Sequence, residues 1–537
     1  MTPEMPMPIV QPNRPNEQTG GGEQPPPAPV EIELKLRAAP EDLERLRRAE
    51  LLTRIAAGPG TARSLTSFYY DTPDCALQRR GVTLRVRRIG QRFVQTLKTE
   101  RRGDGLARGE WEVALPAMVP APDAFDDPEA KALLDGVPVD ALTHLFTSRI
   151  QRETRILSLP DAVVECAFDT GTIETRDASD PVAEIELELK EGRTAALYRL
   201  ALTFLDEVPL RVSEVTKAER GYRLVARRPP GVMYDPKTPL TSRMTVDEAI
   251  GTVLARCLRH WTANEAAAED GGDPGGVHQM RVALRRLRSA LALFRKTVPS
   301  PTLDWLRDEA KWLAGALGPA RDWDVFLNAT VEPLDTMRPD DPGIAVLRAA
   351  AMRQREAGYA AVRQALADPR CARLHLTLGE WLERRGWRDH ASTATLTALV
   401  EPIDGLAGRL IARAHRKVVT RGRHLARLDP PHRHEVRIAL KRLRYAMDFF
   451  RPLYPEKRAK PFATQLSRLQ DAFGHLNDVA TAETLLQRLT GESADPALHR
   501  AAGMVLGWHA RGAESSEPEL LAQWDAFRAV RPFWTRE

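Results

Sequence analysis

The spacing of apolar residues changes once along this chain of 537 residues, and that change predicts two domains of different fold class. Residues 30–225 repeatedly alternate apolar and polar side chains with a period of two, which indicates strands. Helical spacing interrupts the strands at 40–50 and 193–208, so we expect an antiparallel α+β domain. From residue 243 to about residue 530 the spacing is helical almost throughout, which predicts an all-α domain.

Composition marks the segments outside these two domains. Residues 1–29 are rich in Pro, Gly, Gln and Asn and contain almost no large apolar side chains, so we expect a disordered tail. Residues 226–242 contain several prolines and are predicted to form a linker.

The helical part repeats itself with an offset of 156 residues. The sequence HQMRVALRRLR at 278–288 recurs as HEVRIALKRLR at 434–444, and LGPARD at 317–322 recurs as FGHLND at 473–478. Two separate motifs that share one offset indicate an internal duplication. We therefore expect two helical repeats, at about 243–395 and 396–530, facing each other about a pseudo-twofold axis.

Charge and cysteine usage narrow the possible functions. Residues 1–230 contain 32 basic and 36 acidic residues, a formal charge of −4, whereas residues 231–537 contain 46 and 37, a charge of +9. The helical part is therefore the better candidate for binding a polyanion. The four cysteines lie far apart, which excludes a disulfide framework and a cysteine zinc site. The sequence contains neither a long apolar run nor a signal-peptide pattern, so we expect a cytoplasmic protein with no membrane partner.

Charged side chains form rows on several predicted strands. Glu31, Glu33 and Lys35 fall on one face of their strand, and the same alternation holds at 184–190 and 83–87. Like charges that lie opposite each other destabilise a sheet, so these rows must be neutralised. A closed barrel with carboxylates on some strands and Arg or Lys on others would do so, together with metal ions and a bound polyanion. Carboxylates without His or Cys partners suit Mg²⁺ or Mn²⁺.

Residues 30–225 resemble the CYTH domain, the family of triphosphate tunnel metalloenzymes. The resemblance implies an eight-stranded antiparallel β-tunnel that binds a linear triphosphate. The motifs that carry it, in the family's order, are Glu31-x-Glu33-x-Lys35, Tyr69-Tyr70-Asp71-Thr72-Pro73, Leu84-Arg85-x-Arg87, Thr96-Leu97-Lys98, Glu184-x-Glu186-x-Glu188 and Lys217-Ala-Glu-Arg220-Gly-Tyr222.

The same resemblance implies roles for individual residues. The cations that would grip phosphate are Lys35, Arg85, Arg87, Lys98, Arg152 and Lys217. The carboxylates that would hold Mg²⁺ or Mn²⁺ are Glu31, Glu33, Asp169, Glu186 and Glu188. Arg149 and Arg155 compete with Arg152 for one phosphate contact, and Arg152 is our choice.

Such a site suits phosphoryl transfer from triphosphate to water. Cations and metal offset the charge on the phosphoryl oxygens, and a metal-bound water is the nucleophile. We predict an inorganic triphosphatase. The family also contains thiamine triphosphatases and adenylate cyclases, which this sequence does not separate from it. A non-catalytic protein that senses phosphate chains is a further alternative.

Basic residues form the same stripe in both helical repeats. On a helix, positions i, i+3, i+7 and i+10 share one face. The first stripe consists of His278, Arg281, Arg285 and Arg288, and the second of His434, Arg437, Lys441 and Arg444. We expect Asp322, Asp324 and Asp478 to be structural, pairing with arginines on neighbouring helices.

Residues 243–530 resemble the CHAD domain, an all-helical module often found after a CYTH domain, and the two stripes carry this resemblance. It implies binding of inorganic polyphosphate in a positively charged groove between the two bundles, and hence association with polyphosphate granules. Nucleic acid is the alternative polyanion. The stripes lack interleaved aromatic residues for base stacking, so we do not expect a nucleic-acid partner.

Overall fold

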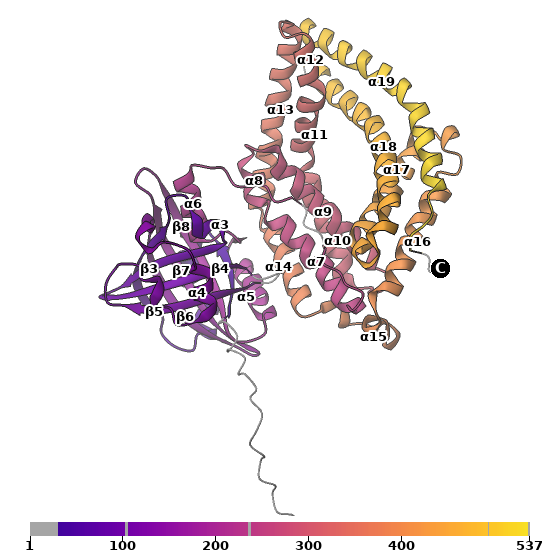
Figure 1. The fold of residues 1–537 in the computed structure, drawn as a ribbon. Helices are drawn as coiled ribbons and strands as arrows, with labels where there is room; N and C mark the ends of the chain where they lie inside the picture. Colours follow the sequence, from indigo (N-terminus) through magenta and orange to yellow (C-terminus); the bar gives the residue numbers. More distant parts are fainter. Residues whose placement is uncertain (1–29, 102–105, 235–237, 492, 535–537) are drawn as a thin grey trace, which may run out of the picture.

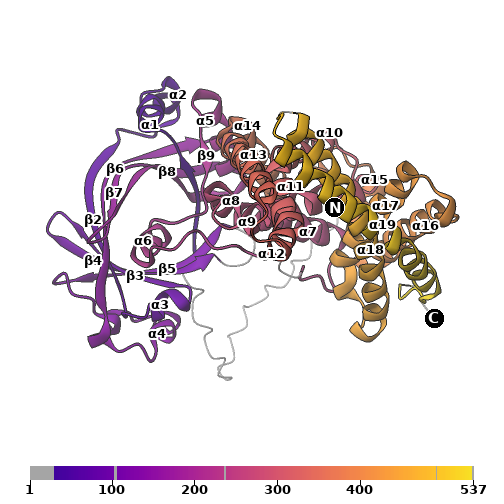
Figure 2. The same ribbon diagram turned by 90° about the horizontal axis from the view of Figure 1, so that it is seen from above.

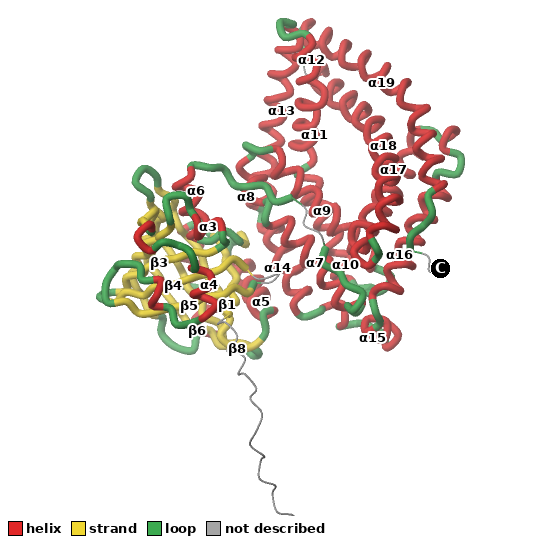
Figure 3. Tube along the Cα trace, viewed as in Figure 1, coloured by secondary structure: helices red, strands yellow, loops and turns green. Residues whose placement is uncertain are grey.

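The structure is a computed structural model, and it describes residues 30–101, 106–234, 238–491 and 493–534. The predicted tail, residues 1–29, lies outside the described residues. A β-barrel and a helical part lie side by side (Figure 1), and among the described residues the strands belong to the barrel (Figure 3). In the described ranges, no helix is long and apolar enough to cross a bilayer.

The N-terminal part is a closed antiparallel barrel, which confirms the predicted β-tunnel. The strands follow the order β5-β4-β3-β2-β6-β7-β8-β1, and the pairing of β1 with β5 closes the ring of eight. A short strand, β9 (Arg211–Val212), pairs with β1 at its edge. The eight strands of the ring are β1 (Val30–Arg37), β2 (Thr61–Asp71), β3 (Val82–Ile89), β4 (Arg92–Arg101), β5 (Ala107–Leu115), β6 (Thr143–Leu159), β7 (Ala162–Glu174) and β8 (Ser179–Gly192).

Six helices accompany the barrel: α1 (Pro40–Arg47), α2 (Glu50–Ile55), α3 (Ala76–Arg79), α4 (Pro128–Leu134), α5 (Ala195–Glu207) and α6 (Lys217–Ala226). The period of two along β1 separates the two sides of the barrel wall. Leu34 and Leu36 are buried on the outside in one cluster with residues of α1 and α5. Glu33 and Lys35 line the interior. Figure 2 shows α6 inside the ring of strands.

The C-terminal part is helical, as predicted. Its helices are α7 (Val246–Thr262), α8 (Glu265–Asp270), α9 (Pro274–Phe294), α10 (Pro301–Ala316), α11 (Gly318–Phe326), α12 (Glu332–Met337), α13 (Pro342–Ala367), α14 (Pro369–Glu383), α15 (Thr393–Val400), α16 (Ile403–Arg421), α17 (Pro430–Phe450), α18 (Glu456–Gly491) and α19 (Pro496–Ala529).

The offset of 156 residues recurs in the helix bounds, because α17 begins and ends 156 residues after α9. The equivalent residues Phe294 and Phe450 contact each other edge to face, with ring centroids 6.3 Å apart. Equivalent residues meet in this way near a twofold axis, so the contact supports two repeats related by a pseudo-twofold axis. The repeats also differ: the first has separate helices α10 and α11, with Pro319 early in α11, whereas α18 runs on as one helix.

Helix α14 joins the helical part to the barrel. Its residues Ala372 and Leu376 are buried in the same cluster as Leu200 and Phe204 of α5. A side chain at Gly379 would clash with the ring of Tyr198, so the two helices approach closely here. The two parts are thus joined by one shared apolar cluster at this interface, and this cluster holds α14 against α5.

Candidate active site

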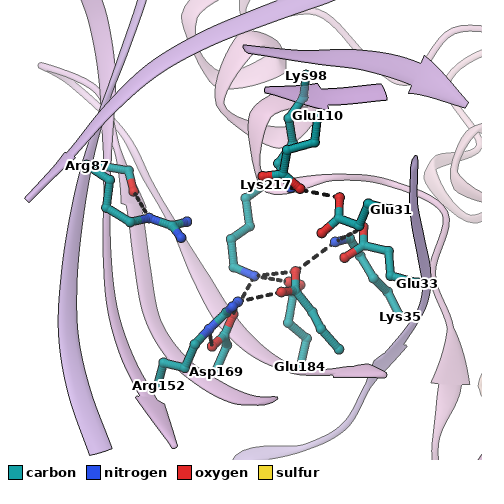
Figure 4. A network of polar contacts seen from close by, with 12 residues as sticks. Glu31, Glu33, Lys35, Arg87, Lys98, Glu110, Arg152, Asp169, Glu184 and Lys217 are labelled. Atoms are coloured by element: carbon teal, nitrogen blue, oxygen red, sulfur yellow. Dashed lines mark hydrogen bonds and ion pairs between the residues drawn. The ribbon is translucent and has the colours of Figure 1, made fainter. Parts of the chain in front are cut away.

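A cavity of about 1010 Å³ occupies the barrel. All eight strands of the ring contribute side chains to its lining, and Lys217 enters it from the first turn of α6. The rows of charge predicted on the strands therefore face a common interior. The charges are not evenly distributed, however, because Arg87 lies apart from the carboxylates, which gather around the lysines and Arg152 (Figure 4).

The first group of carboxylates surrounds Lys217. Its Nζ lies 2.6 Å from Asp169 Oδ2 and 3.0 Å from Glu186 Oε1, and it also contacts Glu184. Arg152 donates to both oxygens of Asp169, at 2.6 and 2.5 Å. Burial alone would raise the pKa of Asp169, but Lys217 and Arg152 lower it. These three carboxylates are close enough together to share a cation, and the Lys217 ammonium already lies among them.

The second group lies on β1 and β5. Lys98 Nζ is 2.9 Å from both Glu31 Oε2 and Glu110 Oε2. Arg108 Nε is 2.7 Å from the same Glu31 oxygen, and the Arg108 guanidinium also contacts Glu33. Burial would raise the pKa of Glu31, but Lys98 and Arg108 hold it well below its ordinary value. Glu31 is therefore ionised at neutral pH.

Lys35 connects the two groups. Its Nζ lies 2.6 Å from Glu33 Oε1 and 2.7 Å from Glu186 Oε1. The barrel register places Lys35 directly opposite Glu186, and Glu33 opposite Glu188. One ammonium thus stabilises a carboxylate from each group, and the carboxylate side of the cavity is one continuous network.

Arg85 and Arg87 of β3 are the cavity's cations with the fewest close carboxylate partners. Arg87 Nε donates to Ser67 Oγ at 2.9 Å, and among the described residues no carboxylate forms an ion pair with it. Arg85 lies 3.6 Å from Glu110 and 3.9 Å from Glu112, and its Nε is buried with no hydrogen-bond partner in the described part of the chain. Burial and the neighbouring Arg85 and Arg152 lower the pKa of Arg87 to about 10. Buried donors that protein groups leave unsatisfied indicate a site for an anion.

The predicted phosphate-binding residues all line this cavity: Lys35, Arg85, Arg87, Lys98, Arg152 and Lys217. Of the three arginines considered on β6, Arg152 alone is among the cavity's lining residues. Arg149 pairs instead with Glu174 at 3.1 Å, and Arg155 pairs with Glu153.

The predicted metal ligands fall into two kinds. Glu31, Glu33, Glu186 and Glu188 line the cavity. Glu188 pairs with Lys190 at 2.6 Å rather than with Lys217. Asp169 lies behind the cavity wall, fully buried, and both of its oxygens accept from Arg152.

Several polar or charged side chains in or next to the cavity were not predicted. They are Tyr69 of β2, Arg108, Glu110 and Glu112 of β5, and Glu184 of β8. The three residues of β5 alternate with a period of two, as the predicted strands do, so the same signal could have found them. Glu184 and Tyr69 stand in motifs quoted above, where no role was assigned to them.

The basic stripe of α9 lies against α10 and α11. Arg281 Nη1 donates to the carbonyl of Ala314 at 2.8 Å. The Nε atoms of Arg281, Arg285 and Arg288 are buried, and no hydrogen-bond partner among the described residues reaches them. Burial and the neighbours Arg321, Arg285 and Arg281 lower the pKa of His278 to about 4. Positive charge is thus concentrated here, and the nearby carboxylates are Asp322 beside Arg281 and Asp308 beside Arg288.

The stripe of α17 is more exposed to solvent than that of α9. His434 and Arg444 are exposed, whereas Arg437 and Lys441 are half-buried. Arg444 Nη1 donates to Gln470 Oε1 at 3.1 Å. The two stripes therefore occupy equivalent helices but differ in exposure.

The aspartates predicted to be structural can be checked in part. Asp324 is buried, and it accepts from Arg355 Nε at 2.7 Å and from the Tyr359 hydroxyl at 2.9 Å. The pKa of Asp322 is raised, because the effect of burial outweighs that of the nearby Arg281 and Arg321, which lower it. The side chain of Asp478 lies outside the described residues.

Comparison with known proteins agrees with this architecture. The profile of the CYTH domain matches residues 30–222, and that of the CHAD domain matches residues 252–487. An inorganic triphosphatase of Haemophilus influenzae is 28% identical over 198 residues, which cover 37% of this chain and 56% of that protein. An uncharacterized protein of Mycobacterium tuberculosis is 28% identical over 307 residues, which cover 54% of this chain and 56% of that protein. The chain thus spans about half the length of these curated relatives.

Among solved structures, the crystal structure of the CHAD domain from the plant Ricinus communis is 32% identical to this chain. The similarity covers 56% of this chain and 98% of that domain, with a TM-score of 0.49.

Proposed function

Because the chain belongs to the proteins in which a CYTH domain is followed by a CHAD domain, we propose that it hydrolyses inorganic triphosphate inside the β-tunnel. The observation that carries this proposal is the pair of β3 arginines in the cavity: Arg85 Nε is buried without a hydrogen-bond partner among the described residues, and Arg87 forms no ion pair with a carboxylate there. A linear triphosphate presents to such donors the several negative oxygens that they need. The similarity to an inorganic triphosphatase supports the same substrate.

The carboxylates fit a hard divalent cation such as Mg²⁺ or Mn²⁺. The cavity lining offers carboxylate oxygens, and it includes no His or Cys among the described residues. This donor set suits Mg²⁺ or Mn²⁺. We propose that Glu31, Glu33, Glu186 and Glu188 hold the metal. Asp169, unlike these four, is not among the lining residues, and both of its oxygens accept from Arg152, so its role in this proposal is to orient Arg152 and Lys217.

A metal held there supplies positive charge to the phosphoryl oxygens and activates water. The protein's own cations compensate the remaining negative charge of the phosphate chain. In this proposal the cavity-lining cations bind the phosphate chain: they are Arg85, Arg87, Lys35, Lys98 and Lys217, with Arg152. Fixed charges in a buried site stabilise the charge that develops during phosphoryl transfer better than mobile water does.

Comparing substrates tests this function. We expect the full chain to release phosphate from tripolyphosphate, with Mg²⁺ or Mn²⁺, faster than from ATP or thiamine triphosphate. Formation of cyclic AMP from ATP would instead identify an adenylate cyclase. Tight binding of tripolyphosphate without turnover would identify a sensor of phosphate chains.

We further propose that the helical part binds inorganic polyphosphate and so associates with polyphosphate granules. The binding residues in this proposal are His278, Arg281, Arg285, Arg288, His434, Arg437, Lys441 and Arg444. The observation that favours this second function is the set of three buried arginine Nε atoms on α9 that lack partners among the described residues. A chain of phosphates would supply acceptors to all three at once.

Salt-dependent calorimetry on the full chain tests polyphosphate binding. Replacing Arg281, Arg285 and Arg288 with Ala should weaken binding and flatten its dependence on salt, because fewer counterions are released. The triple change at Arg437, Lys441 and Arg444 should do the same if the repeats build one groove. Ala at the exposed Arg54, Arg63 and Arg92 of the barrel removes equal charge and should leave both quantities unchanged. Parent-like affinity and salt slope in both stripe variants would refute the proposal.

A further inference from the structure

The cavity of the barrel extends beyond the strands to the helical part. Its lining includes Arg259 and Thr262 on the last turn of α7, Ala263 after it, and Ala266 of α8. Residues 231–233 of the connecting segment line it as well. One wall of the candidate active site therefore belongs to the helical part, which lies beside the ring that contains α6 (Figure 2).

Several contacts fix this wall in place. The side chain of Asn264, between α7 and α8, accepts from Met233 N at 3.0 Å and donates to Met233 O at 2.9 Å. Arg211 of β9 forms a two-pronged ion pair with Glu269 of α8, at 2.6 and 2.9 Å. Together with the core shared by α5 and α14, these bonds hold α7 and α8 against the barrel. These contacts make the wall formed by α7 and α8 an integral part of the cavity.

We call the space between the first turn of α6 and the α7–α8 corner the outer chamber. Its charged lining consists of Glu214, Glu219, Arg223 and Arg259. Arg223 already pairs with Glu219. Arg259 is half-buried and projects from the last turn of α7. Carboxylates and guanidinium groups are combined here as they are in the tunnel, where we propose that such a mixture holds a phosphate chain with its metal.

The size of the cavity also points to a longer substrate. At about 1010 Å³ it is at the upper end of the range of ~300–1,000 Å³ that is usual for sites of drug-sized ligands. A linear triphosphate is much smaller than such a ligand. Three phosphates bound between Arg87 and Lys217 would therefore leave the outer chamber free for a continuation of the chain.

We propose that Arg259 determines chain-length specificity by binding the phosphate that follows the three held in the tunnel. Linear chains of four or more phosphates then bind with one end in the tunnel and the next phosphate against the helical part. This inference rests on the proposed triphosphatase site. It adds that a residue of the helical part contacts the substrate, so the two parts form one site.

Comparing tripolyphosphate with tetrapolyphosphate in the full chain tests the role of Arg259. Arg259→Ala should lower kcat/KM for tetrapolyphosphate about tenfold, the usual effect of losing a hydrogen bond to a charged group, and leave that for tripolyphosphate within about twofold. Arg259→Lys keeps the charge and should recover part of the loss. Arg256→Ala, one turn earlier on α7 and outside the lining, is the matched control and should preserve both values.

Three results would overturn the role of Arg259: no change for either substrate, an equal loss for both, or an equal effect of Arg256→Ala. Equilibrium binding separates this inference from the proposed function. If the parent chain hydrolyses neither substrate, the proposed function fails, and calorimetry of the two phosphate chains then decides. Weaker binding of tetrapolyphosphate alone in Arg259→Ala would uphold the contact, whereas unchanged or absent binding would refute it.

Discussion

The ammonium group of Lys35, on β1, donates a hydrogen bond to Glu186 Oε1, on β8, at 2.7 Å, and the two residues are direct cross-strand neighbours. The exposed fractions of their side chains are only 4% and 14%. Since Lys35 also contacts Glu33, it compensates carboxylates of two strands, which Arg108, Arg152 and Lys217 contact as well. Removing one member of a buried ion pair is costly because the remaining charge is left without compensation.

Lys35→Met should therefore lower the free energy of unfolding by about 3–5 kcal/mol, measured by urea denaturation of the full chain. The double variant with Glu186→Gln should recover part of this loss, since it also removes one of the carboxylates that lose their ion pair with Lys35. Lys190→Met, which breaks the more exposed pair with Glu188, is the control and should cost at most about 1 kcal/mol. Parent-like stability of Lys35→Met would show that the ion pair does not hold the network together.

Replacing Arg87 should have the opposite effect on stability, because the anion that we propose it binds is the substrate and not a carboxylate of the protein. Arg87→Met removes a buried cation that lies near Arg85 and Arg152, so stability should be unchanged or higher. The value of kcat/KM for tripolyphosphate should fall at least ~10²-fold, about 2.7 kcal/mol of lost transition-state stabilisation. Arg149→Met, on the same barrel but paired with Glu174 and exposed, should keep both properties. Full activity in Arg87→Met would remove this residue from the substrate site.

Polyphosphate binding should depend on pH through His278. Burial and three neighbouring arginines hold the pKa of His278 at about 4 in the free protein, below its ordinary value of 6.5. Bound phosphates would raise this pKa, because they favour the protonated ring. Binding would then take up a proton, and the affinity for long chains should increase as the pH falls from about 7 to about 5.

Calorimetry in buffers with different heats of ionisation measures this proton uptake. His278→Ala should abolish the part that belongs to this residue, while His390→Ala, at an exposed position outside both stripes, should retain it. The same proton uptake in His278→Ala and in the parent would contradict the placement of polyphosphate beside His278.

Local sequence patterns were sufficient to predict the kind of fold and many of the residues that line the barrel cavity. Alternation along Glu31–Leu36 and 184–190 predicted strands whose charged faces line one interior, because a period of two places those side chains on one side of a sheet. The repeated stripe predicted that α9 and α17 are equivalent helices. Both inferences use spacings of a few residues, which the geometry of a single strand or helix determines.

The pairing of distant residues could not be predicted in this way. Which cation reaches which carboxylate depends on the register and closure of the barrel, so the sequence did not reveal that Lys217 lies among Asp169, Glu184 and Glu186. The packing of Ala372 and Leu376 of α14 against α5 of the other domain is likewise not encoded in local spacing. For the same reason the contribution of Arg259 to the cavity became visible only in three dimensions.

Phosphate release from tripolyphosphate by the full chain tests the proposed function most directly, with Mg²⁺ or Mn²⁺ present and after chelation. The parent should be active only with the metal. Glu31→Gln and Glu33→Gln should each lower turnover at least ~10²-fold, about 2.7 kcal/mol in the barrier, with circular dichroism like that of the parent. Glu174→Gln, half-exposed and outside the cavity lining, should retain full activity. Hydrolysis that continues without metal, or undiminished turnover in both tunnel variants, would contradict a metal-dependent triphosphatase.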